Sequence, residues 1–507
     1  MEDGQSPGVS HATSHDSFKS TSEVPSLDIS HYEKERKGYL QHFAASTNDD
    51  GQKHGQQELR NSPLLSLKVK CSAEEDDPSL FPQYGLLGMH IGTHDQIASH
   101  EPILMNTNAP TSTFLCGSQG AGKSHSLACM LENALLPQEN INTLIQPLAG
   151  VVFHYYNDGS SVAAEVADLC ANGIKVRVLV SRSNYHALRK AYMMSVPGAN
   201  AQNMTVHSFL LQDGQLTVQR MLQLMSFSDS NTGMPLYMDI LMQILRDTAV
   251  KGTALSLSTL EDQLAGQDFA PSQRNMLNMR LALLRGFCAS SAKATLAKTR
   301  MPAERRLQPP VSDQDVFRLE PGTLTIIDLS DPFVDASTVC VLFKICLELI
   351  TAQKPKSGLV VALDEAHKYL NASDAAADFT EQIPTTIRMQ RHNATRVIVA
   401  TQEPTISPLL LDLCSVTIVH RFSSPAWYAA IKGHLSGASD MTTKQADQHD
   451  MFQRIVGLGL GESLVFSPAS YLCGGGEEGE ERKLGSGFIV TRTRRRRGRG
   501  GETRFSV

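Results

Sequence analysis

The sequence predicts an α/β fold with a mainly parallel sheet, a helical insertion and a disordered N-terminal arm. Two observations predict the class. Short apolar, β-branched runs alternate with stretches of helical periodicity from residue 78 onward, which is typical of a parallel sheet covered on both faces. One of these runs enters a glycine-rich turn that leads directly into a helix. The third feature, a polar segment over residues 1–77, sets the arm apart.

Composition indicates a soluble intracellular protein, cytoplasmic or nuclear. Of the 507 residues, 41% are apolar and 19% are charged, which excludes a wholly disordered chain. No run of 18 apolar residues is present, so a membrane-spanning helix is not expected. The N-terminus lacks a basic region followed by an apolar stretch, and the nine cysteines are scattered without a CxxC pair. These features fit a reducing compartment.

The N-terminal 77 residues are rich in Ser, His, Gln and acidic side chains, and their apolar periodicity is weak. Such a segment buries too little apolar surface to offset its ordering entropy, so we expect disorder. The net charge of −6 argues against a protein that coats DNA through overall basicity. If nucleic acid binds, we expect local contacts, for which 285–306 and the arginines at 494–497 are candidates. Solvated linker and tail residues explain both basic segments equally well.

The predicted strands are short and apolar, and most lie on either side of a helical middle section. They are 111–116, 150–154, 175–180, 324–328, 359–363, 396–400 and 416–420. A terminal pair is expected at 463–467 and 488–492. Apolar spacing predicts helices at 123–135, 235–250, 272–285 and 336–351.

These elements suggest five consecutive segments. They are a disordered arm (1–77), the first half of the core (78–184), a mostly helical insertion (185–310), the second half of the core (311–470), and a polar insert with a terminal strand and basic tail (471–507).

The glycine-rich turn fits the pattern GxxxxGK[ST] at every fixed position. It comprises Gly117, Ser118, Gln119, Gly120, Ala121, Gly122, Lys123 and Ser124. Glycines let successive backbone N–H groups face phosphates, and the following helix N-terminus adds a favourable dipole. Lys123 can reach the β- and γ-phosphates of ATP, and the Ser124 hydroxyl can ligate Mg²⁺. With a strand before it and a helix after it, this loop (Walker A) predicts nucleotide binding.

A carboxylate pair follows the strand at 359–363. Asp364 is placed to hold Mg²⁺ or its water, and Glu365 to polarise an attacking water (Walker B). Two adjacent acids favour hydrolysis over phosphoryl transfer to a small molecule, so we reject a kinase. Asp328 also ends a strand but has no partner acid, so we interpret it as a turn residue.

Three further polar residues are candidates for the reaction. Gln402 follows the strand at 396–400 and, if that strand neighbours the phosphate loop, could sense the γ-phosphate. Arg388 and Arg391 are three residues apart, so we expect them on one helix face. They could reach the nucleotide of a neighbouring subunit as arginine fingers, although solvated surface arginines are an equal alternative.

Taken together, these motifs resemble the HerA/FtsK superfamily of P-loop ATPases, in particular its HerA-like branch. The matching stretches are TFLCGSQGAGKSHS, PGTLTIIDLS, GLVVALDEAHKYL, IRMQRHNATRVIVATQEPTISPLLLDLCSVTIVHRFSSP and GLGLGESLVFSP. The resemblance implies a RecA-like core, Mg-dependent ATP hydrolysis, assembly into a hexameric ring and helicase-like translocation of DNA. It supports Lys123 and Ser124 on phosphate and metal, Gln402 as sensor, and the arginines as trans-acting groups.

The alternative is a P-loop ATPase switch or scaffold that regulates protein partners without moving DNA. It is favoured by the short segment before the phosphate loop, because HerA-like translocases usually carry a β-barrel there. The string DEAH does not make the chain a DEAH-box helicase, since too few residues follow Glu365 for a second complete lobe.

Overall fold

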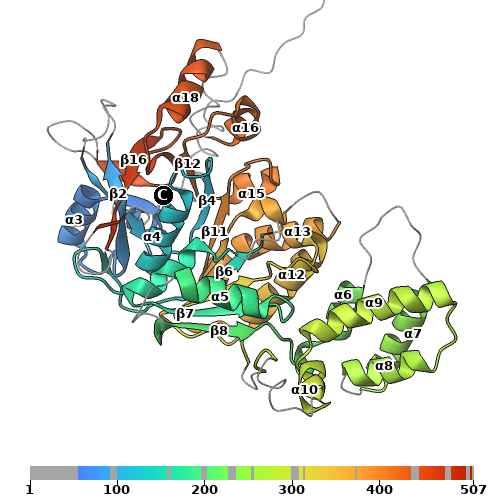
Figure 1. The fold of residues 1–507 in the computed structure, drawn as a ribbon. Coiled ribbons are helices and arrows are strands. Elements are labelled where there is room, and N and C mark those ends of the chain that lie inside the picture. Colours follow the sequence, from blue (N-terminus) through green and yellow to red (C-terminus); the bar gives the residue numbers. More distant parts are fainter. Residues whose placement is uncertain are drawn as a thin grey trace, which may run out of the picture. The chain divides into compact units, whose positions relative to one another are not determined.

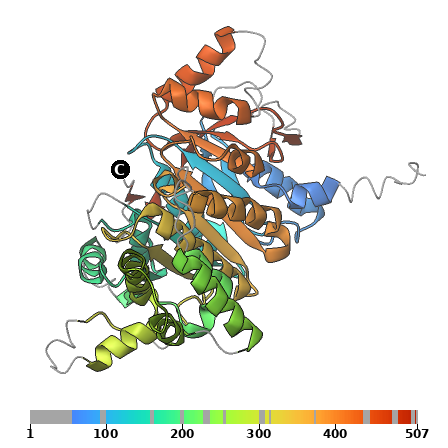
Figure 2. The same ribbon diagram turned by 90° about the vertical axis from the view of Figure 1, so that its right-hand side faces the viewer.

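Sixteen strands of the described residues form one mixed sheet, with helices on both faces (Figures 1 and 2). The computed structural model describes residues 55–91, 100–156, 162–195, 202–225, 236–252, 256–298, 308–311, 315–370, 374–435, 445–473, 481–497 and 503–504. These residues belong almost entirely to the unit Glu58–Val507. The predicted α/β class is confirmed. No helix in the described ranges combines the length and apolarity needed to cross a bilayer.

The parallel half of the sheet contains the seven predicted core strands and one strand that was not predicted, β8, in the order β12-β4-β11-β10-β6-β9-β7-β8. Their bounds are β4 Ser112–Cys116, β6 Ala149–His154, β7 Lys175–Val180, β8 Met204–Ser208, β9 Thr323–Asp328, β10 Leu359–Leu363, β11 Thr395–Thr401 and β12 Val416–His420. All seven neighbouring pairs are parallel. The carboxyl ends of β4, β11, β10 and β6 therefore lie side by side along one edge.

Side chains of the parallel strands alternate between two apolar layers. Phe114 and Val151 face one layer, and Leu115 and Val152 face the other. The first layer is completed by helices that include α12 Ala336–Ala352, α13 Asp374–Arg388 and α15 Pro408–Leu413. The second is completed by α4 Lys123–Leu135, the 3₁₀ helix η1 Glu165–Asn172 and α5 Tyr185–Ser195. This double coverage explains why the core strands are almost continuously apolar.

An antiparallel extension continues the sheet beyond β12. It contains β13 Glu462–Phe466, β16 Ile489–Thr493, β2 Tyr84–His90, β3 Pro102–Asn106, β1 Leu64–Ser66, β14 Tyr471–Cys473, β15 Glu481–Lys483 and β5 Asn142–Thr143. The predicted terminal pair is present as β13 and β16. The β1–β14 pair alone in this extension is parallel. Strands β1, β2 and β3 of this extension precede the phosphate loop, whereas the sequence analysis predicted no strand before residue 111.

The predicted disorder of 1–77 is wrong for its last part, and residues 1–54 lie outside the described residues. Strand β1 pairs with β3, and helix α3 (Leu67–Asp76) follows it. Leu65 and Val69 are buried against Leu80 and Phe81. Strand β1 is only three residues long, and its two leucines are too few to give a periodic signal in the sequence.

The helical insertion is smaller than predicted. Residues in α5 and β8 fall inside 185–310 but belong to the core, because β8 pairs with β7 and α5 packs in the second apolar layer. The insertion itself comprises α6 Val218–Met225, α7 Leu236–Val250, α8 Leu257–Ala265, α9 Pro271–Phe287 and α10 Ala289–Lys298, which Figure 1 shows gathered beyond β8. It contacts the core through α6 and α12, where Arg220 Nε lies 3.2 Å from Glu348 Oε2. Part of the basic segment, 299–307, lies outside the described residues.

The predicted basic tail is not simply a solvated end. Arg494 and Arg496 follow β16 and are buried, and both form ion pairs with Glu132 of α4. Arg496–Arg497 (β17) also pairs with Thr503–Arg504 (β18). The remaining short helices are η3 Asp213–Gln215, η4 Ala366–Lys368, α14 Gln390–Asn393, α16 Pro425–Ile431, η5 Lys432–His434 and α18 Gln445–Gly457. All nine cysteines are free thiols.

Candidate functional site

The phosphate loop lies between β4 and α4, and its glycines fit a backbone that side chains would obstruct. Gly117 and Gly122 have φ values of 153° and 112°, in the range that favours glycine. A Cβ at Gly117 would approach His420 Cβ to 2.6 Å, and one at Gly122 would approach Gly461 Cα to 3.1 Å. Ser118 donates from its Oγ to the carbonyl oxygen of Arg421 at 2.8 Å, which ties the loop to the end of β12.

A cavity of about 720 Å³ opens at the carboxyl edge of β4, β11, β10 and β6. It brings together most of the predicted site residues, from segments up to 283 positions apart in the sequence. The lining residues are Gln119, Gly120, Gly122, Lys123, Ser124, His125, His154, Tyr156, Val162, Ala163, Glu165, Asp364, Glu365, Lys368 and Gln402. The loop and the carboxylate pair thus face one common space, as a nucleotide site requires.

Glu365 is held between two polar side chains. Gln402 Nε2 donates to Glu365 Oε1 at 2.9 Å, and His367 Nδ1 lies 3.4 Å from Glu365 Oε2. The order β4-β11-β10 explains the first contact, because β11 places Gln402 between the phosphate loop and the carboxylates. Glu365 itself has a φ of 49°, a left-handed conformation that is uncommon for a non-glycine residue and is often found at functional sites.

Asp364 is buried and pairs with a histidine that the sequence analysis did not single out. His154, the last residue of β6, lies with Nδ1 3.1 Å from Asp364 Oδ2. Burial opposes the charged form of His154, but the hydrogen bond to Asp364 and the charge of Asp328 outweigh it and raise the pKa of His154 to about 9. A polar residue after four apolar positions is the only signal that the sequence offers for His154.

Asp328 has a structural role, as interpreted from the sequence, and an electrostatic one. It is fully buried at the end of β9, in register with His154. Its Oδ1 accepts from the Ser330 N–H at 3.0 Å, and its Oδ2 accepts from the Tyr192 hydroxyl at 2.7 Å. Asp328 thus shapes the turn after β9 and supports the positive charge of His154.

The oxygen ligands expected for Mg²⁺ fit the cavity. The Ser124 hydroxyl and the Asp364 carboxylate both line it, and Mg²⁺ prefers such oxygens together with water and substrate phosphates over a closed protein cage. Within the described ranges, no group of three His, Cys, Asp or Glu side chains could hold a metal ion by itself.

Arg388 and Arg391 do not line the cavity, and they do not share one helix. Arg388 ends α13, and Arg391 lies in α14 after a break at Met389. Both side chains are exposed and precede the first residue of β11, whereas the cavity lies beyond its last. Seven strand residues separate these ends by roughly 20 Å. The arginines thus do not reach the cavity of their own chain, and their trans-acting role stays a prediction, with solvated surface arginines as the alternative.

Comparisons with known proteins give structural similarities only. No protein-family model matches the sequence, and no curated protein matches it. VirB4 of Thermoanaerobacter pseudethanolicus is similar in structure, with 12% identity and a TM-score of 0.46 over 81% of this chain and 96% of that chain. The genome packaging NTPase B204 of Sulfolobus turreted icosahedral virus 2, in complex with ATP-gammaS, gives 14% identity and a TM-score of 0.21 over 29% and 63%. These values assign no family, so the functional proposal rests on the cavity.

Proposed function

We propose that the chain is a Mg-dependent ATP-binding and ATP-hydrolysing P-loop protein of HerA/FtsK type that works as a ring-forming DNA translocase. The observation that carries the ATPase proposal is the common cavity of Lys123, Asp364 and Glu365, contributed by β4 and β10. The ring and the DNA come from the resemblance of the motifs. In such a ring, the exposed Arg388 and Arg391 would be free to reach the nucleotide of a neighbouring subunit.

Each side chain has a distinct role in the proposed reaction. The backbone of 117–124 and the Lys123 ammonium hold the phosphates, and Ser124 with Asp364 would hold Mg²⁺, which neutralises phosphate charge when bound. Glu365 orients and polarises the attacking water. Gln402 fixes the position of Glu365 through the 2.9 Å hydrogen bond, and it lines the same cavity as the loop, where it would sense the γ-phosphate.

The test compares three preparations of the full chain. Lys123→Ala should weaken ATP binding, because the phosphates lose their direct cation. Glu365→Gln should retain binding but lower kcat by about 10²-fold or more, since the amide cannot polarise water. Equal turnover in Glu365→Gln and the unchanged protein would remove Glu365 from the mechanism.

The DNA part of the proposal needs its own measurement. ATP turnover should rise with double-stranded DNA, and the nucleotide-bound protein should have the mass of a multimer. Turnover that DNA leaves unchanged in a monomeric protein would instead support the switch or scaffold alternative. Replacement of Arg305 and Arg306 by glutamate should abolish the DNA effect if the basic segment tracks phosphates.

A further inference from the structure

The cavity holds a cation on the far side of the carboxylate pair from the phosphate loop. Lys368 lies at the end of η4, and its Nζ is 4.6 Å from the centroid of the Tyr156 ring. Within the described part of the chain, its ammonium makes no ion pair. Contact with the Tyr156 ring thus positions the Lys368 ammonium in the cavity. Because an aromatic ring carries no net charge, this contact leaves the positive charge of Lys368 available to an anion.

The order of the strands determines which part of a nucleotide this cation would meet. Along the carboxyl edge come the phosphate loop after β4, Gln402 after β11, the carboxylates after β10, and Tyr156 after β6. Neighbouring strands are about 4.8 Å apart, so Tyr156 lies about 14 Å along the edge from the end of β4. In the proposed reaction, Glu365 polarises the water that attacks the γ-phosphorus of ATP. Residues on the side of Glu365 away from the phosphate loop would therefore face the γ-phosphoryl group.

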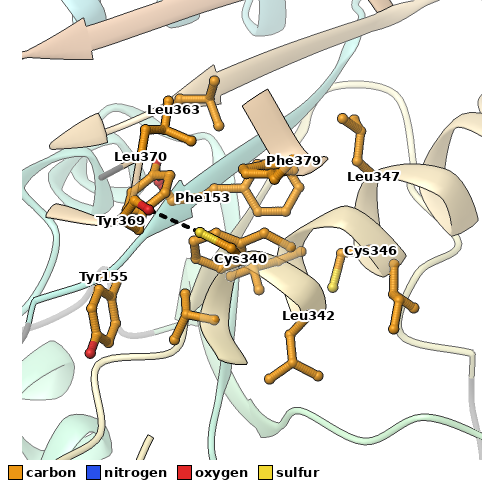
Figure 3. Close-up of a cluster of buried hydrophobic side chains, with 14 of the residues drawn as sticks. Phe153, Tyr155, Cys340, Leu342, Cys346, Leu347, Leu363, Tyr369, Leu370 and Phe379 are labelled. Carbon is orange, nitrogen blue, oxygen red and sulfur yellow. Dashed lines mark hydrogen bonds between the residues drawn. The ribbon is translucent and has the colours of Figure 1, made fainter. Parts of the chain in front are cut away.

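Packing behind the η4 turn fixes the direction of Lys368. Tyr369 and Leu370, the next two residues, are buried in an aromatic cluster with Phe153 and Phe379 (Figure 3). The Cys340 thiol donates to the Tyr369 carbonyl oxygen at 2.9 Å, which pins the same turn from α12. At its start, the Lys368 N–H donates to the Glu365 carbonyl oxygen at 2.8 Å. The turn is thus held at both ends, with Lys368 toward the cavity.

We propose that Lys368 is a catalytic residue that contacts the γ-phosphoryl group of ATP from within the same subunit. This inference deepens the ATPase proposal and rests on it. As charge builds on the γ-phosphoryl oxygens during attack by water, the ammonium stabilises them, while the Glu365 carboxylate receives the water proton. Phosphate and ADP are the products, and the proton received by Glu365 then passes to solvent. Lys368 would then let one subunit hydrolyse ATP without an arginine from its neighbour.

The experiment measures kcat, KM and nucleotide affinity for Lys368→Met, with Lys190→Met as the matched control. Lys190 is exposed on α5 and does not line the cavity. Lys368→Met should lower kcat by about 10²-fold, the usual cost of losing one group that stabilises transition-state charge. It should weaken ATP binding roughly tenfold and leave ADP binding unchanged, because ADP lacks the γ-phosphate. Lys190→Met should change neither quantity.

Further variants separate a catalytic role from a structural one. Lys368→Arg should restore most of the ATP preference, and Tyr156→Leu should lose part of it because the aromatic support is gone. A Lys368→Met protein with the kcat and ATP-to-ADP affinity ratio of the unchanged chain would overturn the inference. If the unchanged chain binds ATP but has no turnover, the ATPase proposal fails, while the affinity ratio still tests the contact of Lys368.

Discussion

Removal of the charge on Glu132 should destabilise the helix that carries the phosphate loop. Glu132 lies in α4 and is 1% exposed. Its Oε2 lies 2.9 Å from Arg494 Nη2, and its Oε1 lies 3.2 Å from Arg496 Nε. The nearest other carboxylate, Asp168, is 3.7 Å from Arg496 but more than half exposed. Glu132→Gln therefore leaves two buried guanidinium groups without an effective counter-charge.

The cost of this change follows from the burial of the partners. The side chains of Arg494 and Arg496 are only 5% and 7% exposed, so water cannot replace the lost carboxylate. A single broken buried ion pair typically costs 3–5 kcal/mol, roughly, and here two cations share one anion. Each change of about 1.4 kcal/mol alters the equilibrium constant for local opening tenfold. Local opening of α4 should therefore become roughly 10²–10³ times more frequent.

Amide hydrogen exchange of a peptide that covers 123–135 measures this opening directly. Glu132→Gln should accelerate exchange of the slow α4 amides by roughly the same 10²–10³-fold. The control is Glu74→Gln, which breaks the partly exposed pair with Lys70 and should cost about 0.3–0.5 kcal/mol in α3 only. If α4 in Glu132→Gln exchanges within threefold of the unchanged protein, the buried ion cluster does not stabilise the helix.

Two further predictions concern acid stability and assembly. Complete burial, reinforced by the charge of Lys123, lowers the pKa of His420 to about 4, so the folded state favours the neutral imidazole. The contribution of His420 to the free energy of unfolding is therefore present above pH 6.5 and falls by about 3 kcal/mol as the pH drops toward 4. Urea unfolding of His420→Gln should lack this dependence of the unfolding free energy on pH. Replacement of Arg388 and Arg391 by alanine should lower turnover of the multimer and spare that of dilute monomer; equal loss in both states would exclude a trans-acting role.

The sequence predicted the parallel core well because of how that core is buried. Strands β7, β10 and β12 have the predicted bounds. In β10 and β12 every residue is buried, because both faces of these strands are covered, whereas β7 begins with Lys175 and Arg177 in alternation with valines. The polar residues at the ends of β10 and β11 could be found for the same reason. An Asp, Glu or Gln directly after a buried run stands out from it, and parallel topology brings these ends together.

The missed elements are those that depend on partners far along the chain. Strand β1 is three residues long, and its pairing with Tyr471 of β14 spans more than 400 positions. The basic run at the end of the chain looks like a solvated tail by composition. Arg494 becomes a buried residue only because β16 places it against Glu132, 362 positions earlier. No local pattern contains this information.

The turn after β10 shows why the most informative part of the site could not be read from the string DEAHK. An α-helix from Asp364 onward would bring Lys368 back to within about 40° of Asp364, but the chain after β10 forms the short 3₁₀ helix η4 instead. The left-handed conformation of Glu365, at φ 49° and ψ 43°, instead redirects the chain at its second carboxylate. Burial of Tyr369 then opposes relaxation of the strained residue, because relaxation would withdraw an aromatic ring from the core. One turn, which begins at this left-handed residue, therefore carries both Glu365, which accepts from Gln402, and Lys368, which lies over the Tyr156 ring, so it links the proposed base and the proposed cation.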